Sequence, residues 1–457
     1  MIKKILALAL VACMLFAIVA CGGGDTPTSA PDAPASAPAA EQPADDDTQP
    51  APTADDSDAE SATIRIFTNL PDRNNGQGLV EQMLIDAYLA ENPHISIEIE
   101  ALHDEEYKIK FAAYSAGREM PDFTSGWGMP SWIDERVDAG IFHELNPADF
   151  NFGFVEGTFA GFSKDGKLYG IPRNTDIMGF YYNQAIFDEI GVSTPGSWDE
   201  LLVLANDIRA AGYQPVSTNG AEGWSIAIML TGIYQMVSGP GVGARMGGFL
   251  TSQDWSDSKF VEAAGVFQDA AMGGLFANGF ETSDYGTAKS LFTSGQAAMF
   301  YMGSWEASMA VDDDIPSEVR DNIRMFMLPE VSGGAGSLTD ISLWNGGGYF
   351  VTADSPVADE AIKLLQYFFR EDNWNRLTWE YDVCMSAQDF TPYFSGNESA
   401  VLLQFVDAMN AATAVTGVPY IDMGSADFKT RSERLIVELA IGAITPEQHS
   451  ESLGTGT

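Results

Sequence analysis

The sequence predicts an α/β fold with mostly parallel sheets, because strand-like and helix-like stretches alternate from Ala62 onward. TIRIFTN (63–69) has the alternation of a strand, and LVEQMLIDAYLAENP (79–93) has helical spacing that ends before a proline. HISIEIEAL (94–102) alternates again. Strand, helix and strand at this spacing predict a βαβ unit.

The same order continues downstream. FYYNQAIFDEIGV (180–192) is expected to be a strand followed by a helix. Ser197 and Glu200 have the spacing of a capping box, which predicts that a helix starts there. Pro356 suits the first turn of a helix over 357–369, and Pro446 suits a last short helix.

The N-terminus carries an export signal. Residues 1–20 combine Lys3 and Lys4 with an apolar run that has the length of a signal-peptide core. Ile18-Val19-Ala20-Cys21 resembles a bacterial lipobox, in which a peptidase cuts before the cysteine and lipid is attached to its thiol. An ordinary secretory signal and an uncleaved membrane anchor are the two alternatives. The resemblance implies that the rest of the chain works outside the cell membrane.

Residues 21–60 are predicted to be a disordered tether. The stretch after Cys21 has ten acidic residues, seven prolines and no Lys or Arg. It has almost no apolar side chain larger than alanine, so burial cannot offset the entropy of the chain. We expect a flexible acidic spacer between an anchor and a folded region.

Composition excludes several functions. The formal net charge of −42 disfavours binding to nucleic acid or anionic lipid and favours a soluble monomer. Cys384 is the one cysteine of the globular region, which excludes an internal disulfide there, and we expect it to be a small buried side chain. The four histidines have no metal-ligand spacing, and no nucleophile or phosphate-loop motif is present. We therefore predict no catalytic residue, no metal site and no cofactor.

Six stretches resemble one family, the extracellular solute-binding proteins of ABC importers, of the family 1 type that mostly carries sugars. Each stretch is a weak signal, but the six follow the order of the family. They are MPDFTSGW (120–127), DGKLYGIPRNTD (165–176), FYYNQAIFDEIGVSTPGSWDEL (180–201), SGQAAMFYMGSWEA (294–307), NGGGYFVTADSPVADEAIKLLQYF (345–368) and IVELAIGAITPEQ (436–448).

The resemblance implies a periplasmic-binding-protein-like fold, in which two α/β lobes close on a ligand. We expect lobe 1 to contain 62–174 plus about 310–350, and lobe 2 to contain 175–309 plus about 351–457. The implied function is to capture a carbohydrate, such as an oligosaccharide, and to deliver it to an ABC transporter permease. The lipobox places the protein on the extracellular face of the cell membrane, in a single-membrane bacterium.

A sugar site combines aromatic rings, which stack on C–H faces, with polar groups that bind hydroxyls. Four tryptophans lie where the family blocks place the cleft or beside glycines in loops: Trp127, Trp224, Trp305 and Trp344. In several family members, a tryptophan at the position of Trp305 stacks on the sugar. For each of the four, burial in the core is the alternative.

Three charged residues complete the predicted site. Asp72 and Arg73 follow the first strand, and Asp176 lies in the crossover between the lobes, where the family often has an acidic ligand contact. Asp72 and Asp176 have turn capping as an equal alternative. Arg73 has a solvated surface charge as its alternative.

Two other functions remain open from the sequence. Abundant carboxylates permit a surface-anchored carbohydrate-active enzyme, because spacing in sequence says nothing about distance in space. Acidic site residues also permit a polyol or a cationic solute as the ligand of a binding protein. The resemblance disfavours the enzyme.

Overall fold

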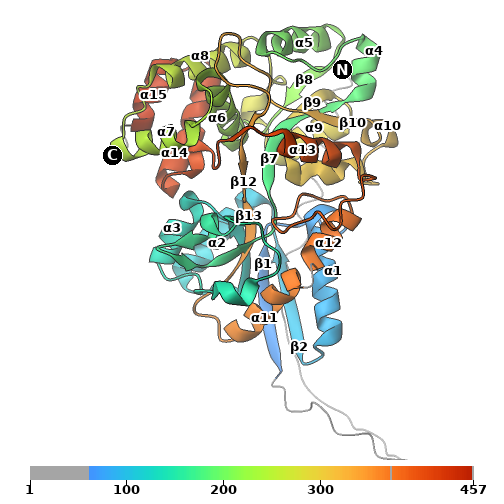
Figure 1. Ribbon diagram of the computed structural model, residues 1–457, viewed down its shortest axis with the longest axis vertical. Helices are drawn as coiled ribbons and strands as arrows, with labels where there is room; N and C mark the ends of the chain where they lie inside the picture. Colours follow the sequence, from blue (N-terminus) through green and yellow to red (C-terminus); the bar gives the residue numbers. More distant parts are fainter. Residues whose placement is uncertain (1–60, 371–372, 455–457) are drawn as a thin grey trace, which may run out of the picture. The chain divides into compact units, whose positions relative to one another are not determined.

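The structure is a computed structural model that describes residues 61–370 and 373–454. The predicted signal peptide, Cys21 and the tether lie outside the described residues. Residues 58–457 form one compact unit. Two separate β-sheets, each flanked by helices, organise it (Figure 1).

The first lobe is built on a five-stranded sheet with the order β2-β1-β3-β13-β6. Its strands are β1 (Ala62–Thr68), β2 (Ile95–Ala101), β3 (Phe123–Trp127), β6 (Gly170–Pro172) and β13 (Gly347–Val351). β1 runs parallel to β2 and β3, whereas β13 runs antiparallel to β3 and β6. Its helices are α1 (Gly76–Glu91), α2 (Asp104–Gly117), α3 (Pro130–Asp138), α11 (Ala358–Phe369) and α12 (Asn373–Glu380).

The second lobe is built on the sheet β10-β7-β9-β8, with β12 also paired to β7. These strands are β7 (Asp176–Asn183), β8 (Gln214–Ser217), β9 (Ala297–Gly303), β10 (Ile323–Phe326) and β12 (Leu343–Trp344). The helices of this lobe are α4 (Gln184–Ile190), α5 (Trp198–Ala210), α6 (Trp224–Ser238), α7 (Val242–Ser252), α8 (Ser258–Met272), α9 (Tyr285–Thr293), α10 (Ser317–Arg320), α13 (Ala400–Ala411), α14 (Ala426–Ala440) and α15 (Pro446–Gly454).

Short elements connect these layers. Two small sheets pair β4 (Ser163–Lys164) with β5 (Lys167–Leu168) and β11 (Asp340–Ile341) with β14 (Ala414–Val415). The 3₁₀ helices are η1 (Pro147–Phe150), η2 (Ala160–Phe162), η3 (Phe280–Thr282), η4 (Ser304–Ala310) and η6 (Tyr420–Asp422).

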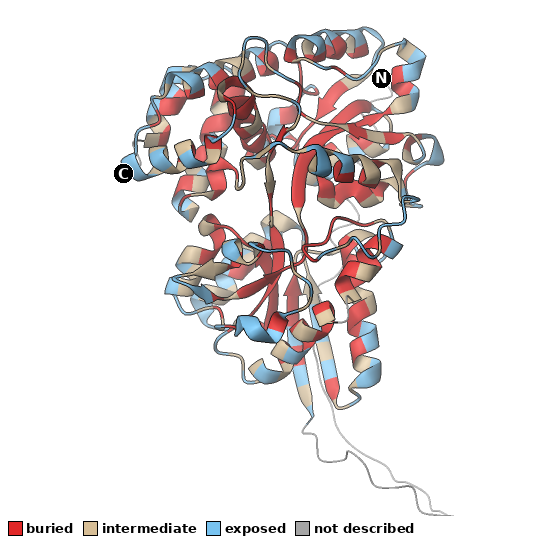
Figure 2. Ribbon diagram, in the orientation of Figure 1, coloured by how far each residue is buried: buried red, intermediate tan, exposed pale blue. Residues whose placement is uncertain are grey.

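The central strands of the second lobe are buried on both faces (Figure 2). Phe180 and Tyr301 pack into one hydrophobic cluster, while their neighbours Tyr181 and Phe300 pack into another on the opposite face. Side chains alternate across a strand, so a strand covered on both sides needs a continuous apolar run. This explains why FYY and AAMFYM lack polar alternation.

The α/β class and the two lobes are confirmed, but the expectation of mostly parallel sheets is wrong. Both sheets are mixed, and in the second only β8 and β9 pair in parallel. The reason is that β10, β12 and β13 enter from distant segments and pair in the antiparallel sense. A βαβ pattern fixes the relative direction of two strands that follow each other in the sequence, but it does not fix the direction of strands that come from distant segments.

The return segments differ in part from the expected ranges. β13 belongs to the first lobe, as expected, but β10 (Ile323–Phe326) belongs to the second sheet rather than to lobe 1, and α11 and α12 belong to the first lobe rather than to lobe 2. The chain crosses between the lobes at 172–176, at 344–347 and near Cys384, which is buried as expected. The expected ranges also imply three crossings, but the last two lie at 344–347 and near Cys384 rather than near 310 and 350.

The predicted helix starts at Ser197 and Pro446 are confirmed. Ser197 Oγ accepts a hydrogen bond from the Glu200 N–H at 3.3 Å, and Glu200 Oε2 accepts one from the Ser197 N–H at 3.2 Å. This capping box satisfies two donors that a helix start otherwise leaves free. α15 begins at Pro446, as expected, whereas α11 begins at Ala358 with Val357 as its N-cap, so Pro356 precedes the helix rather than lying in its first turn.

None of the helices in 61–370 and 373–454 has, by itself, the length and hydropathy of a membrane span. α6 and α7 reach that length and composition together, but they meet at an angle of 113°.

His449 makes the fold sensitive to acid. It is buried in α15 against Phe260, and neither ring nitrogen has a hydrogen-bond partner among the described residues. Burial lowers its pKa from 6.5 to about 3. The unfolded chain therefore binds a proton that the folded protein does not, and stability decreases as pH falls from 6.5 towards 3.

Between pH 7.5 and pH 5, the wild type should lose about 2 kcal/mol of its free energy of unfolding because of His449. The acid-induced loss in His449→Leu should be smaller by that amount. The measurement is urea unfolding of the wild type and the variant at both values of pH. Exposed His103→Gln is the matched control. An equal acid-induced loss in wild type and His449→Leu would show that His449 is not responsible.

Candidate functional site

Three of the predicted tryptophans form one aromatic wall, which we define as Trp224, Trp305 and Trp344. The ring centroids of Trp224 and Trp305 lie 6.1 Å apart, and those of Trp305 and Trp344 lie 6.4 Å apart. Trp224 starts α6, Trp305 lies in η4 directly after β9, and Trp344 ends β12. The wall thus joins elements that are far apart in the sequence.

Hydrogen bonds fix the edges of two of these rings. Trp224 Nε1–H donates to Glu222 at 3.0 Å, and Trp305 Nε1–H donates to the Tyr285 hydroxyl at 3.1 Å. Tyr285 also stacks near Trp224, with centroids 6.0 Å apart. Protein groups therefore occupy both indole N–H donors, and both rings are only partly buried.

Glu306 and Lys289 hold Tyr285, the hydrogen-bond partner of Trp305, in place. The Tyr285 hydroxyl donates to one carboxylate oxygen of Glu306, and the Lys289 ammonium lies 2.8 Å from the other. A Cβ at Gly303 would overlap the ring of Trp305, so only glycine permits this position of the indole. The ring is consequently held in a defined orientation.

Glu222 connects the wall to α9. It accepts hydrogen bonds from the Trp224 indole, the Asn219 amide and the backbone N–H of Tyr285. Burial raises the pKa of Glu222, against these three hydrogen bonds, which favour the charged form. Glu222 lies two residues before Trp224 in the sequence, and this spacing is the one local indication of its contact with the indole. No local pattern marks Tyr285 or Glu306 as partners, because they lie about 20 residues apart.

Asp176 lies beside the wall at the start of β7, where its register partner on β12 is Trp344. The carboxyl is buried and accepts a hydrogen bond from the Asn174 side chain. Burial raises its pKa to about 7, against the effect of this hydrogen bond and of the Arg173 charge. Asp176 therefore binds a proton more readily than an ordinary aspartate.

Trp127 lies on the other lobe, at the end of β3. It is half-buried and packs edge-to-face against Trp132, with centroids 4.8 Å apart, and against Tyr107 at 6.0 Å. The Lys108 ammonium lies 5.4 Å from its ring centroid. The structure thus places Trp127 at the C-terminal end of the central strand of the first sheet, outside the aromatic wall.

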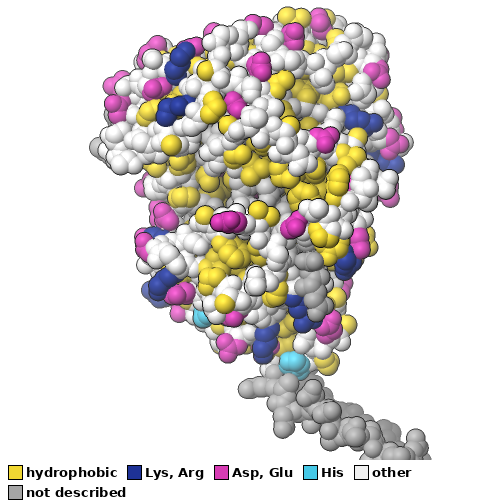
Figure 3. All heavy atoms as spheres, viewed as in Figure 1, with side chains coloured by type: hydrophobic (Ala, Val, Ile, Leu, Met, Phe, Trp, Pro, Cys, Tyr) yellow, Lys and Arg dark blue, Asp and Glu magenta, His cyan; other side chains and the backbone are white. Residues whose placement is uncertain are grey.

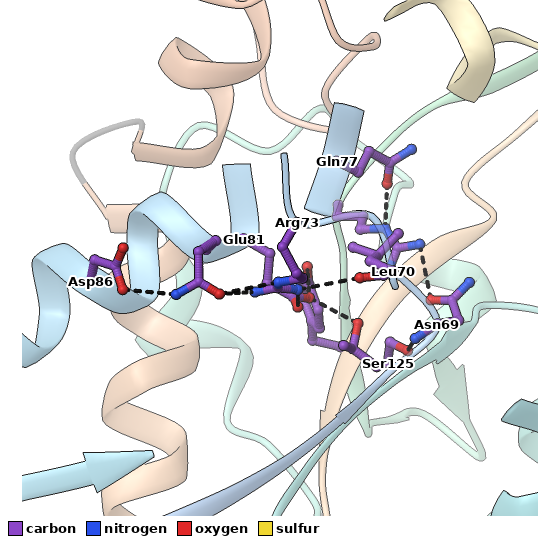
Figure 4. Close-up of polar contacts among 11 residues, drawn as sticks. Asn69, Leu70, Arg73, Gln77, Glu81, Asp86 and Ser125 are labelled. Atoms are coloured by element: carbon purple, nitrogen blue, oxygen red, sulfur yellow. Dashed lines mark hydrogen bonds and ion pairs between the residues drawn. The ribbon is translucent and has the colours of Figure 1, made fainter. Parts of the chain in front are cut away.

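Asp72 and Arg73 have roles within the first lobe. Asp72 is exposed, and its Oδ1 accepts the backbone N–H groups of Asn74 and Asn75 at 3.0 and 3.2 Å, which caps the turn before α1. Arg73 forms an ion pair with the fully buried Glu81 and also donates to Gln82 and to the Leu70 carbonyl (Figure 4). All three guanidinium nitrogens of Arg73 therefore contact protein.

The two lobes also contact each other through a buried polar group. Ser131 of α3 donates to Asp422 of η6 at 2.8 Å, and the Lys429 ammonium of α14 binds the same carboxylate oxygen at 2.5 Å. Nearby Glu433 has its pKa raised to about 7 by burial, although Lys429 and Lys108 lower it. Charged groups of both lobes therefore meet on this side.

A cavity of about 310 Å³ lies between α1, η4 and the third crossover. Asn75, Ser308, Asp312 and Tyr381 are among its lining residues, and none of the predicted tryptophans lines it. Its volume is at the lower end of the range for ligand pockets. Because the aromatic wall lies elsewhere, we do not assign the cavity to the predicted ligand site.

Figure 3 shows that hydrophobic side chains also gather across the middle of the viewed face.

Solved structures share this architecture. A protein from a study of xylan utilisation by Caldanaerobius polysaccharolyticus has a TM-score of 0.77 at 23% identity, covering 86% of this chain and 98% of that one. A chitin oligosaccharide binding protein has a TM-score of 0.75 at 23% identity, with 87% and 98% covered. A solute-binding protein in complex with raffinose has a TM-score of 0.66 at 18% identity, with 86% and 97% covered. These similarities confirm the fold.

Sequence comparison adds a relative and a family. The multiple sugar-binding protein of Streptococcus mutans is 23% identical over 274 residues, which are 58% of this chain and 63% of that protein. The match thus spans somewhat less than two thirds of the relative. The family model of the bacterial extracellular solute-binding proteins matches residues 74–373. This match covers well over half of the sequence, and the chain therefore belongs to the bacterial extracellular solute-binding protein family.

Proposed function

We propose that this protein is a lipid-anchored, extracytoplasmic binding protein that captures an oligosaccharide between its two lobes and delivers it to an ABC transporter permease. The observation that carries the proposal is the aromatic wall. Two of its indoles donate their N–H groups to protein partners, and both rings remain partly exposed, so stacking is their available contact with a ligand. Sugar C–H faces are suited to such rings.

Family membership supports this proposal. The family is one of solute-binding proteins, which favours binding without turnover over the carbohydrate-active enzyme that the sequence left open. The names of the relatives include sugar and oligosaccharide binding. The lipobox-like Cys21 supports attachment to the outer face of a single bacterial membrane.

Closure of the lobes is the proposed mechanism. A ligand that contacts both lobes stabilises the closed state by the difference between its affinities for the two states. The aromatic wall belongs to the second lobe, and Trp127 with Lys108 supplies contacts from the first. The Ser131–Asp422 hydrogen bond would add to the closed state without contacting the ligand.

A thermal-shift panel of xylotetraose, chitotetraose and raffinose tests the proposal. A bound oligosaccharide should raise the melting temperature with concentration, and chromatography should detect no product. In the same expression host, the wild type should fractionate with membranes and Cys21→Ser should not. Release of shorter sugars would indicate the enzyme, and no shift with a broader panel of oligosaccharides would reject carbohydrate binding.

A further inference from the structure

Three buried polar atoms near the crossovers lack a hydrogen-bond partner among the described residues. They are Arg173 Nη1, Asn174 Oδ1 and Trp344 Nε1. The three side chains are only 4%, 2% and 5% exposed. Buried polar atoms in folded proteins almost always have partners, so three neighbouring exceptions need a physical explanation.

The side chains of these three residues approach Gly346 and Gly347. A Cβ at Gly347 would lie 2.7 Å from Asn174 Oδ1 and 2.9 Å from Arg173 Nε. A Cβ at Gly346 would lie 2.9 Å from Trp344 Nε1 and would overlap Asp176 Oδ2. The two glycines therefore allow polar side chains from both crossovers to approach the same stretch of backbone.

This cluster adjoins the candidate ligand surfaces of both lobes. Trp344 belongs to the aromatic wall, and its indole N–H is the one in the wall that has no acceptor within residues 61–370 and 373–454. Arg173 donates through Nε to Gln77 at 2.6 Å and through Nη2 to Asn69 at 3.4 Å, in the segment that follows β1. Its remaining nitrogen, Nη1, is the unpartnered one.

We propose that Arg173, Asn174 and Trp344 form a hydroxyl-binding subsite for a neutral sugar ring. Trp344 Nε1–H and Arg173 Nη1–H donate to ligand hydroxyls, and Asn174 Oδ1 accepts a hydrogen bond from one. This inference rests on the proposed carbohydrate function and adds the residues that recognise the polar edge of the ligand, while the aromatic wall contacts its C–H face.

Donor and acceptor chemistry favours hydroxyls over a carboxylate. A hydroxyl both donates and accepts, so adjacent hydroxyls satisfy all three atoms. A carboxylate would satisfy the two donors, but it would place an acceptor against Asn174 Oδ1 and a negative charge near Asp176. The subsite is therefore expected to select neutral oligosaccharides over those built from uronic acids.

Titration of the purified full chain with xylotetraose, chitotetraose, raffinose and trigalacturonate tests the subsite. Trp344→Phe removes the indole donor and keeps an aromatic ring, and Asn174→Ala removes the acceptor. We expect each to weaken binding of the neutral ligand at least tenfold, and trigalacturonate not to bind. Trp198→Phe is the matched control, because Trp198 is also a buried tryptophan with an unpartnered Nε1 but lies in α5. It should leave affinity unchanged.

Two outcomes overturn the subsite while the proposed function stands: unchanged affinity in both folded variants, or tight binding of trigalacturonate that depends on Arg173. The melting temperature of each ligand-free variant reports whether it folds, and either variant alone decides if the other does not fold. Failure of the wild type to bind any oligosaccharide would instead reject the proposed function and the subsite with it.

Discussion

Replacing Arg73 with alanine is expected to destabilise the protein by about 3–5 kcal/mol, because it leaves the buried Glu81 carboxylate without its counter-charge. Glu81 is fully buried in α1. Its Oε2 accepts hydrogen bonds from Thr68 at 3.1 Å and from Tyr349 at 2.7 Å, and its Oε1 pairs with Arg73. Two hydroxyls remain after the substitution, but they do not neutralise the charge.

Urea unfolding at neutral pH measures this loss. Gln82→Ala is the matched control, since it removes a neutral acceptor of Arg73 and retains the ion pair. We expect the control to cost well under half as much. If Arg73→Ala has wild-type stability but binds sugar more weakly, Arg73 belongs to the ligand site, as the sequence first indicated.

Replacing Trp305 with alanine is expected to weaken oligosaccharide binding by roughly 2–3 kcal/mol, or about 30- to 150-fold. Trp305 is the middle ring of the aromatic wall and contacts the rings on both sides. Its orientation is fixed by Tyr285, so the free protein does not have to order this side chain on binding. Rigid aromatic side chains of this kind dominate binding energies.

Titration calorimetry against the best ligand of the panel provides the measurement. Trp305→Phe keeps an aromatic face and loses the hydrogen bond to Tyr285, so it should lie between the wild type and Trp305→Ala. Equal affinity of all three proteins would remove Trp305 from the binding site. A ligand-free melting temperature near that of the wild type would separate lost contact from lost folding.

Local sequence patterns predicted the elements whose cause is local. Ser197 and Glu200 cap α5 through bonds between residues three apart, and Pro356 precedes α11, so both starts could be read from spacing. The alternating residues of β1 and β2, with a helix between them, likewise predicted adjacent parallel strands. These features depend on neighbours along the chain.

The candidate site was only partly predictable. Glycine-flanked tryptophans indicated Trp224 and Trp305, and the crossover position indicated Asp176. Tyr285, Asn174 and Arg173 had no comparable signal, because their importance comes from contacts with residues 20 to more than 100 positions away. Conversely, Asp72 and Arg73 had the expected strand-end position, yet their contacts lie within their own lobe.

The sequence by itself predicted an export signal with a lipobox-like cysteine, and it determined the α/β class and several of the helices. Each of these follows from composition or from periodicity over a few residues. Only the tertiary structure decided the mixed sheets, the positions of the last two crossovers and the grouping of three tryptophans into a wall. The physical reason is that late strands and loop side chains choose partners by burial and hydrogen bonding across the fold, and sequence spacing does not encode those distances.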